Sequence, residues 1–223
     1  MPENRFFLDA PFQKGLTLDL PQEELHHLRV MRIHPNDTFD LVNGQNQLAT
    51  VRLEKGTSVV LLEVITKPPP KHQLILAQAF LRPKNLEFVI EKGTELGATA
   101  FWLFPASRSE KGSPKLARLR QLTISALKQC GRLDLPQIKI FPDLPKPLPG
   151  TAFFGNPGSK TLLSPSSTDT TLFIGPEKGF SPEEENHLHK ALKAKGIRLN
   201  PHILRAETAA LCGLSLLAIN ENF

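Results

Sequence analysis

Short runs of alternating apolar and polar residues fill the first third of the chain, a pattern that predicts β-strands. Turn residues such as Asn43-Gly44 separate these runs. One segment, PQEELHHLRVMR, instead predicts a helix, with Pro21 in its first turn. The expected strands are RFFL, GLTLDL, DTFDLVNG, QNQLATVRL and TSVVLLEVI. Five short strands and one helix predict a small β-barrel.

Strand-like and helix-like runs alternate in the remaining two thirds. The expected strands are HQLILAQAF, TAFWLF, QIKIF, TAFFG and TTLFI. The expected helices are KNLEFVIEKGTELG, SPKLARLRQLTISALKQCG, PEEENHLHKALKAKG and AETAALCGLSLLAI. In the third helix, Ser181 is the cap, Glu184 its capping-box partner and Gly196 the stop. This alternation predicts an α/β domain with a mostly parallel sheet that is covered on both faces.

The segment TKPPPK, residues 66–71, predicts the domain boundary, because three consecutive prolines stiffen a connection. We expect one domain over 1–70 and another over 71–223. The charge changes at the same point: 1–70 holds 7 Lys and Arg against 9 Asp and Glu, a net of −2, and 71–223 holds 20 against 13, a net of +7. Within 108–132 there are seven bases and one acid, Glu110. Such an excess is typical either of a surface that binds phosphate backbones or of a solvated helix face.

Several function classes are excluded by what the sequence lacks. No apolar run approaches the roughly 20 residues of a membrane-spanning helix, and the N-terminus does not resemble a secretory signal, so we expect a cytoplasmic protein. Cys130, Cys212 and the histidine pairs lack metal-ligand spacing, so we expect reduced thiols and no metal. The standard Rossmann and P-loop fingerprints are absent.

The last predicted helix has almost no polar face, since its apolar residues continue through Ile219. Such a helix is either buried in the core or packed against another subunit. Small residues along it, including Ala209, Ala210 and Gly213, would let a second helix approach closely. We therefore favour a dimer contact over simple core burial.

Two stretches have the composition of ligand loops. In LFIGPEKGFSPEEE, a strand ends at Gly175-Pro176, where main-chain groups could bind a ligand beyond the strand's carboxyl end. A tight turn before a well-capped helix explains the same residues. In LNPHILRAETAALCG, Arg205 and Glu207 begin an apolar helix, where each charge needs a partner. That partner is either a structural ion pair or a ligand.

Taken together, IEKGTELGA, ALKQCGR, IGPEKGFSPEE and ILRAETAAL resemble the ribosomal RNA small-subunit methyltransferase E family. The segment HHLRVMRIHPNDTFDLVNG resembles that family's N-terminal part. The resemblance implies a SPOUT (trefoil-knot) α/β domain that binds S-adenosylmethionine, preceded by a PUA-like β-barrel. It also implies a homodimer that methylates N3 of one uridine in 16S ribosomal RNA of the small subunit.

The resemblance assigns roles to individual residues. Arg205 and Glu207 are the expected catalytic residues. The expected cofactor-binding residues are Asn156, Pro157, Gly175, Pro176, Glu177, Gly179, Phe180, Ile203, Leu204 and Thr208. The expected RNA-binding residues are Arg29, Arg32, Arg108, Lys111, Arg118 and Arg132.

Three positions depart from the family pattern: Lys178 replaces a glycine, Asn200 replaces another glycine, and His202 replaces an arginine. A lysine accepts a positive φ reluctantly, whereas an asparagine tolerates it. Two alternatives stay open, of which only the first draws support from Lys178 and His202. One is a SPOUT-fold RNA-binding protein without activity, and the other is a SPOUT methyltransferase that acts on tRNA.

Overall fold

The structure is a computed structural model that describes residues 5–54, 56–163 and 168–218. It forms two compact units. One unit holds Met1–Pro69 and Ile124–Leu135, and the other holds Pro70–Thr123 and Pro136–Phe223. The proline run at 68–70 ends the first segment, while helix α3 (Leu116–Cys130) contributes residues to both units. The end of the last predicted helix, at Ile219, lies outside the described residues.

The first unit is built around a mixed five-stranded sheet in the order β1-β3-β4-β5-β2. Its elements are β1 (Arg5–Phe7), β2 (Thr17–Asp19), α1 (Gln22–Val30), β3 (Thr38–Val42), β4 (Gln47–Leu53) and β5 (Ser58–Thr66). Only the β1–β3 pair is parallel. All five predicted strands and the helix are present. The sheet is an open half-barrel rather than a closed one, since its edge strands β1 and β2 do not pair with each other.

Residues 124–135 complete the core of this first unit. Leu127 and Leu133 are buried against Phe7 and Val42. Lys128 Nζ donates to Glu24 Oε1 at 2.7 Å, which joins this segment to α1. Nearby main-chain bonds continue the connection, since the amides at 46 and 135 donate to the carbonyls at 133 and 44.

The second unit contains a six-stranded sheet in the order β11-β9-β10-β6-β7-β8, and every neighbouring pair is parallel. Its strands are β6 (Leu74–Ala79), β7 (Ala100–Phe104), β8 (Gln137–Ile140), β9 (Thr151–Gly155), β10 (Thr170–Ile174) and β11 (Lys195–Ile197). Its helices besides α3 are α2 (Pro83–Glu95), α4 (Pro182–Lys190) and α5 (Ala206–Ala218). The predicted parallel α/β sheet is confirmed.

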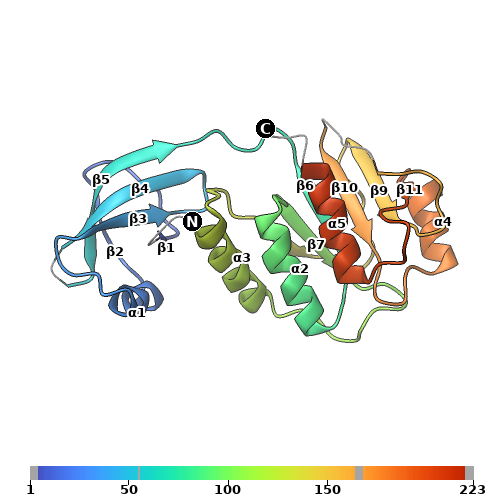
Figure 1. Cartoon of the computed structure of the whole chain (residues 1–223), viewed down its shortest axis with the longest axis horizontal. Helices are drawn as coiled ribbons and strands as arrows, with labels where there is room; N and C mark the ends of the chain where they lie inside the picture. Colours follow the sequence, from blue (N-terminus) through green and yellow to red (C-terminus); the bar gives the residue numbers. More distant parts are fainter. Residues whose placement is uncertain (1–4, 55, 164–167, 219–223) are drawn as a thin grey trace. The chain divides into compact units, whose positions relative to one another are not determined.

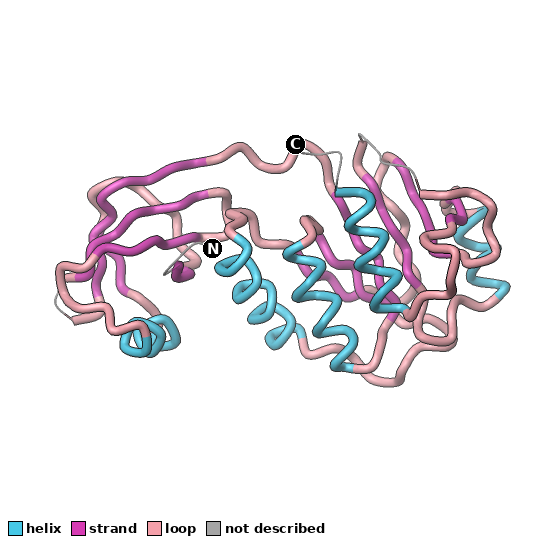
Figure 2. Tube along the Cα trace, in the orientation of Figure 1, coloured by secondary structure: helices cyan, strands magenta, loops and turns pink. Residues whose placement is uncertain are grey.

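Helices cover both faces of the parallel sheet, as the pattern predicted. Helices α2 and α5 contact each other over one face, where Leu76, Ile90 and Leu214 belong to one buried cluster (Figure 1). A second buried cluster on the other face contains Phe104, Phe173 and Leu188, the last from α4. Figure 2 shows the strands of this sheet with the helices beside them. The central strands β6, β7 and β10 are wholly buried, which explains their uninterrupted apolar runs.

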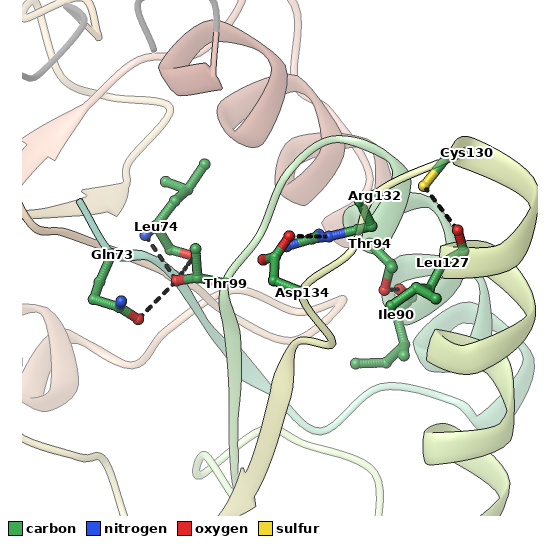
Figure 3. A network of polar contacts seen from close by, with 9 residues as sticks. All are labelled: Gln73, Leu74, Ile90, Thr94, Thr99, Leu127, Cys130, Arg132 and Asp134. Atoms are coloured by element: carbon green, nitrogen blue, oxygen red, sulfur yellow. Dashed lines mark hydrogen bonds and ion pairs between the residues drawn. The ribbon is translucent and has the colours of Figure 1, made fainter. Parts of the chain in front are cut away.

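Polar contacts between neighbouring segments stabilise each unit (Figure 3). In the second unit, the Thr99 hydroxyl accepts from Leu74 N at 2.9 Å and is 3.1 Å from Gln73 Oε1, which joins the starts of β6 and β7. In the first unit, the Arg132 guanidinium forms an ion pair with Asp134. Each contact joins residues of the same unit, so Thr99, Arg132 and Asp134 have structural roles.

Strand β11 was not predicted, and the helix expected to continue to Gly196 ends earlier, at Lys190. The capping box of Ser181 and Glu184 is confirmed. The stop was wrong because Lys193, with φ of 55°, takes the left-handed conformation expected of the glycine. Gly196 lies in β11 instead, where an added Cβ would be 3.0 Å from Phe154 Cζ.

Candidate functional site

A cavity of about 320 Å³ lies at the carboxyl ends of the neighbouring strands β9, β10 and β11. Three loops and the start of α5 form its walls, namely 155–157, 174–180, 197–204, Ala206 and Ala209. We call 174–180 the Gly175 loop and 199–205 the Asn200 loop. Ligands of open parallel sheets bind at this edge, and the volume lies within the range of small-molecule sites.

The Gly175 loop is a tight turn that requires glycine at two positions. An added Cβ at Gly175 would lie 3.0 Å from the main-chain nitrogen of Phe180 and 3.2 Å from the carbonyl carbon of Gly179. Gly179 itself has φ of +71°, and its N–H donates to Pro176 O at 2.8 Å. The loop therefore presents bare main chain at these two points, because a side chain would be crowded at Gly175 and would strain the backbone at Gly179.

Side chains from other elements hold this turn on its outer side. The Gln78 side chain, fully buried at the end of β6, donates through Nε2 to Ile174 O at 3.3 Å and Gly175 O at 3.2 Å. Arg108 donates through Nη1 to Lys178 O at 3.3 Å and Phe180 O at 3.2 Å. The loop's carbonyls are thus fixed before any ligand binds.

Glu177 is bound to the start of α2. Its Oε1 accepts from the main-chain N–H of Arg82 at 3.1 Å and from Asn85 Nδ2 at 3.3 Å. A carboxylate is favoured at a helix N-terminus because the unpaired N–H groups there carry partial positive charge. Glu177 therefore anchors the Gly175 loop to α2.

Lys178 does not have the positive φ that its family position led us to expect, and neither does Asn200. The left-handed residue of the Gly175 loop is Gly179, one position later. Replacing glycine by lysine at 178 therefore causes no backbone strain. Its effect is to place a positive side chain at the rim of the cavity, where Lys178 is exposed.

The other two loops are less constrained. Asn156 accepts from Gly158 N through Oδ1 at 2.8 Å, and its own N–H donates to Ile197 O at 2.8 Å. In the Asn200 loop, Asn200 Oδ1 accepts from His202 N at 3.0 Å. The Ile203 side chain is 86% exposed although it borders the cavity.

The start of α5 carries the two charges that the sequence analysis selected. The Arg205 side chain is exposed, and within the described residues it has neither an ion pair nor a hydrogen bond. Glu207 is half-buried, and its Oε2 is buried without a hydrogen-bond partner. Arg205 and Glu207 therefore do not form the structural ion pair that the sequence analysis left open.

The structure brings most of the expected cofactor residues to one cavity. Those on its wall are Asn156, Pro157, Gly175, Pro176, Glu177, Gly179, Phe180, Ile203 and Leu204. Thr208 is exposed and does not line it, and Arg205 and Glu207 lie beside wall residues without lining it themselves. The sequence analysis missed Ile197, Arg198 and Leu199. Ile197 ends β11 and the other two follow it, whereas the sequence analysis had assigned most of that strand to a helix.

The expected RNA-binding residues belong to both units. Arg29 is exposed on α1, and Arg32 follows that helix with φ of 55°. Arg118 pairs with Glu87 at 3.0 Å, and Arg132 pairs with Asp134 in a largely buried ion pair. Part of the basic excess in 108–132 is thus neutralised inside the protein.

Helix α5 has a buried face and a partly covered one. Ala210, Gly213, Leu214 and Leu217 are buried. The other apolar positions, such as Leu211 and Leu216, are half-buried. Burial also raises the pKa of the Cys212 thiol, whose Sγ is 3.7 Å from Leu199 O in the Asn200 loop.

Two negative findings apply to the described part of the chain. Its His, Cys, Asp and Glu side chains form no group of three or more that could hold a metal ion. None of its helices combines the length and apolar character needed to cross a membrane.

Comparison with known proteins identifies the family. Residues 67–218 match the model of an RNA methyltransferase domain, and residues 20–62 match that of an RNA methyltransferase PUA domain. The Ribosomal RNA small subunit methyltransferase E of Mesomycoplasma hyopneumoniae is 31% identical over 93% of this chain and 95% of its own length. The Ribosomal RNA small subunit methyltransferase E of Rickettsia conorii is 29% identical over 96% of this chain and 95% of its own length.

Solved structures agree with this assignment. The crystal structure of a Ribosomal RNA small subunit methyltransferase E from Neisseria gonorrhoeae bound to S-adenosyl methionine has a TM-score of 0.86, with 27% identity over 96% of this chain and 95% of that one. A putative methyltransferase from Legionella pneumophila, in complex with the same cofactor, has a TM-score of 0.82, with 28% identity over 95% of each chain. The chain belongs to the ribosomal RNA small subunit methyltransferase E family.

Proposed function

We propose that this protein methylates N3 of one uridine in 16S ribosomal RNA, using S-adenosylmethionine and acting on the small ribosomal subunit. Relatives that match almost the whole chain are named as methyltransferases of small-subunit ribosomal RNA. Two structural neighbours contain S-adenosylmethionine. The observation that carries the proposal is the bare main-chain cavity at the ends of β9, β10 and β11. The proposed substrate locates the protein in the cytoplasm.

The cavity residues fit this cofactor. A nucleoside needs an apolar slot with main-chain groups at its edge, and the walls combine Ile174, Leu199 and Ala209 with the bare Gly175 loop. Gly155 and Gly175 add no side chains to this wall, and an added Cβ at Gly155 would lie 3.2 Å from Ile174 Cδ1. When bound, S-adenosylmethionine supplies a methyl group on a positively charged sulfur.

Uridine N3 carries a proton and becomes a good nucleophile only as that proton leaves. The base also has to be unpaired and exposed before N3 can enter a pocket. The chain's tasks are therefore to align N3 and to stabilise the negative charge that develops on the uracil oxygens. Arg205 is suited to the second task, because its guanidinium is exposed and has no partner within the described residues.

The two acids near the site have different environments. Glu177 already accepts two hydrogen bonds from the start of α2, so we assign it to holding the Gly175 loop. Glu207 has a buried oxygen without a partner, so it is the carboxylate available to receive the N3 proton or to orient the uridine. Glu207 would receive this proton as it leaves N3, so that the nitrogen can accept the methyl group that the bound cofactor would supply.

The proposal includes a homodimer in which α5 packs on a second copy. The half-buried apolar positions Leu211 and Leu216 on α5 support this, since they keep apolar area open to solvent in the single chain. The path of a trefoil knot stays a prediction from the family resemblance.

Arg205→Ala tests the assignment of Arg205. We expect turnover to fall about 100- to 1,000-fold, as for the loss of one donor to a developing oxyanion, while S-adenosylmethionine binding survives. The assay uses small subunits from cells that lack the enzyme, mass spectrometry of the RNA, and calorimetry for the cofactor. Equal losses of turnover and cofactor affinity would reject the role.

The same measurements separate the alternatives. A folded wild-type protein that gives no heat with S-adenosylmethionine would be an RNA-binding protein without activity. Modification of tRNA in place of small-subunit RNA would identify the tRNA enzyme.

A further inference from the structure

A second cavity, of about 390 Å³, adjoins the first in the same unit. The two share Glu177 and Lys178 in their walls. The rest of the second cavity is lined by Arg82 and the segment 108–111, which follows β7. A strand that reaches the rim of the first cavity and continues across the Glu177–Lys178 edge would therefore meet the second cavity.

The second cavity carries a net positive charge. Its ionisable side chains are four bases and two acids, namely Arg82, Arg108, Lys111, Lys178, Glu110 and Glu177. Glu110 pairs with Arg82, with 3.4 Å between Oε1 and Nε. Glu177, which is bound to the start of α2, offsets the charge of one more base. The second cavity therefore keeps an excess of positive charge that favours an anion.

Lys111 and Lys178 are free to bind that anion. Both side chains are exposed, and neither forms an ion pair or hydrogen bond with another described residue. Arg108 uses Nη1 for the carbonyls of the Gly175 loop, and its guanidinium has further donors. Lys178 is also one of the positions where this chain departs from its family.

We propose that the second cavity binds a backbone phosphate of the RNA strand, beside the nucleotide that is presented to the cofactor in the first cavity. This inference rests on the proposed function. A phosphodiester fits because it is a compact anion that a lysine ammonium binds as a point charge. A strand fits better than a free ion because the two cavities share one edge, so a strand that presents its base at the first cavity passes over the second.

Lys111→Ala and Lys178→Ala test this site, with Lys190→Ala as the matched control. Lys190 is an exposed lysine of α4 that lines neither cavity. Losing one phosphate contact of a single strand weakens binding about fivefold at 0.1 M salt. We therefore expect the KM for small subunits to rise about fivefold in each variant and more in the double variant. Each increase should shrink as salt is raised, whereas Lys190→Ala should match the wild type.

Cofactor calorimetry on Lys111→Ala separates this effect from damage to the first cavity, because Lys111 does not line it. Unchanged KM values in both variants, or an increase that salt does not reduce, would overturn the phosphate site. Binding of inorganic phosphate as tight as that of a single-stranded RNA oligonucleotide would overturn the assignment to a strand.

The proposed function can fail separately. In that case wild-type protein would leave small-subunit RNA unmodified. Fluorescence anisotropy with the oligonucleotide would still report the lysine contacts, because it measures binding without turnover. A fivefold loss in that assay supports the phosphate site, and affinity equal to that of Lys190→Ala rejects it.

Discussion

The Gly175 loop and the Asn200 loop border the same cavity, but they are held very differently. Gln78, Arg108 and the start of α2 bind the Gly175 loop from outside. The Asn200 loop has one internal side-chain bond, from His202 N to Asn200, and a weak contact between Cys212 and Leu199. Ile203 on that loop is almost fully exposed. One wall is therefore preorganised, while the other has room to adjust around a ligand.

The largest effect in this comparison is expected from Gly175→Ala. The new methyl would press on the main chain at 179–180, where a flexible side chain is not available to yield. Overpacking of this kind costs about 1–3 kcal/mol, so the Kd for S-adenosylmethionine should rise about 5- to 150-fold in calorimetry.

Gly213→Ala is its control, because there the new methyl meets the Leu172 side chain inside the core, at 2.4 Å from Cδ2. It should lower the melting temperature and leave the cofactor Kd close to the wild-type value. If Gly175→Ala lowers only the melting temperature, the Gly175 loop is not the preorganised wall.

A smaller loss is expected from Gln78→Leu, which removes the donor to Ile174 O and Gly175 O without exposing new surface. Buried hydrogen bonds contribute about 1 kcal/mol each, so the cofactor Kd should rise about 5- to 30-fold. Thr170→Val is the matched control, because it also removes a buried donor. Thr170 lies at the opposite end of β10 from the cavity and donates to Thr168 O at 2.9 Å. A cofactor Kd that changes equally in both variants would show that Gln78 only stabilises the sheet.

The smallest effect is expected at the Asn200 loop, from Cys212→Ser. A thiol is a weak donor, so losing its contact with Leu199 should change the cofactor Kd less than about threefold. Because burial raises the pKa of Cys212, little thiolate is present at neutral pH. Iodoacetamide should therefore label exposed Cys130 first, and Cys212 only as the pH rises. Rapid labelling of Cys212 at pH 7 would show that the Asn200 loop opens more widely.

The sequence predicted elements whose signal is local. The apolar runs gave β6, β7 and β10, and Ser181 with Glu184 gave the start of α4. Strand β11 was missed because three residues, Lys-Gly-Ile, are too short for an alternating pattern. These residues form a strand because they pair with β9, which is distant in the sequence.

The role of Gln78 could not be predicted from its own neighbours. It ends an apolar strand, and only the pairing of β6 with β10 brings it to the Gly175 loop. Similarly, Arg108 and Arg118 belong to the same basic stretch, yet one holds the cavity loop and the other pairs with Glu87. Charge patterns identify a basic region, but the fold decides which bases are available.

The placement of 124–135 in the first unit limits how the chain can be dissected. A fragment that starts at residue 70 would keep Leu127 and Leu133 but lose Phe7 and Val42, against which they pack. It would also leave the Lys128 ammonium without Glu24. Such a truncation should expose these leucines and aggregate. The unit that holds the cofactor cavity therefore cannot be prepared as a fragment that starts at the proline run.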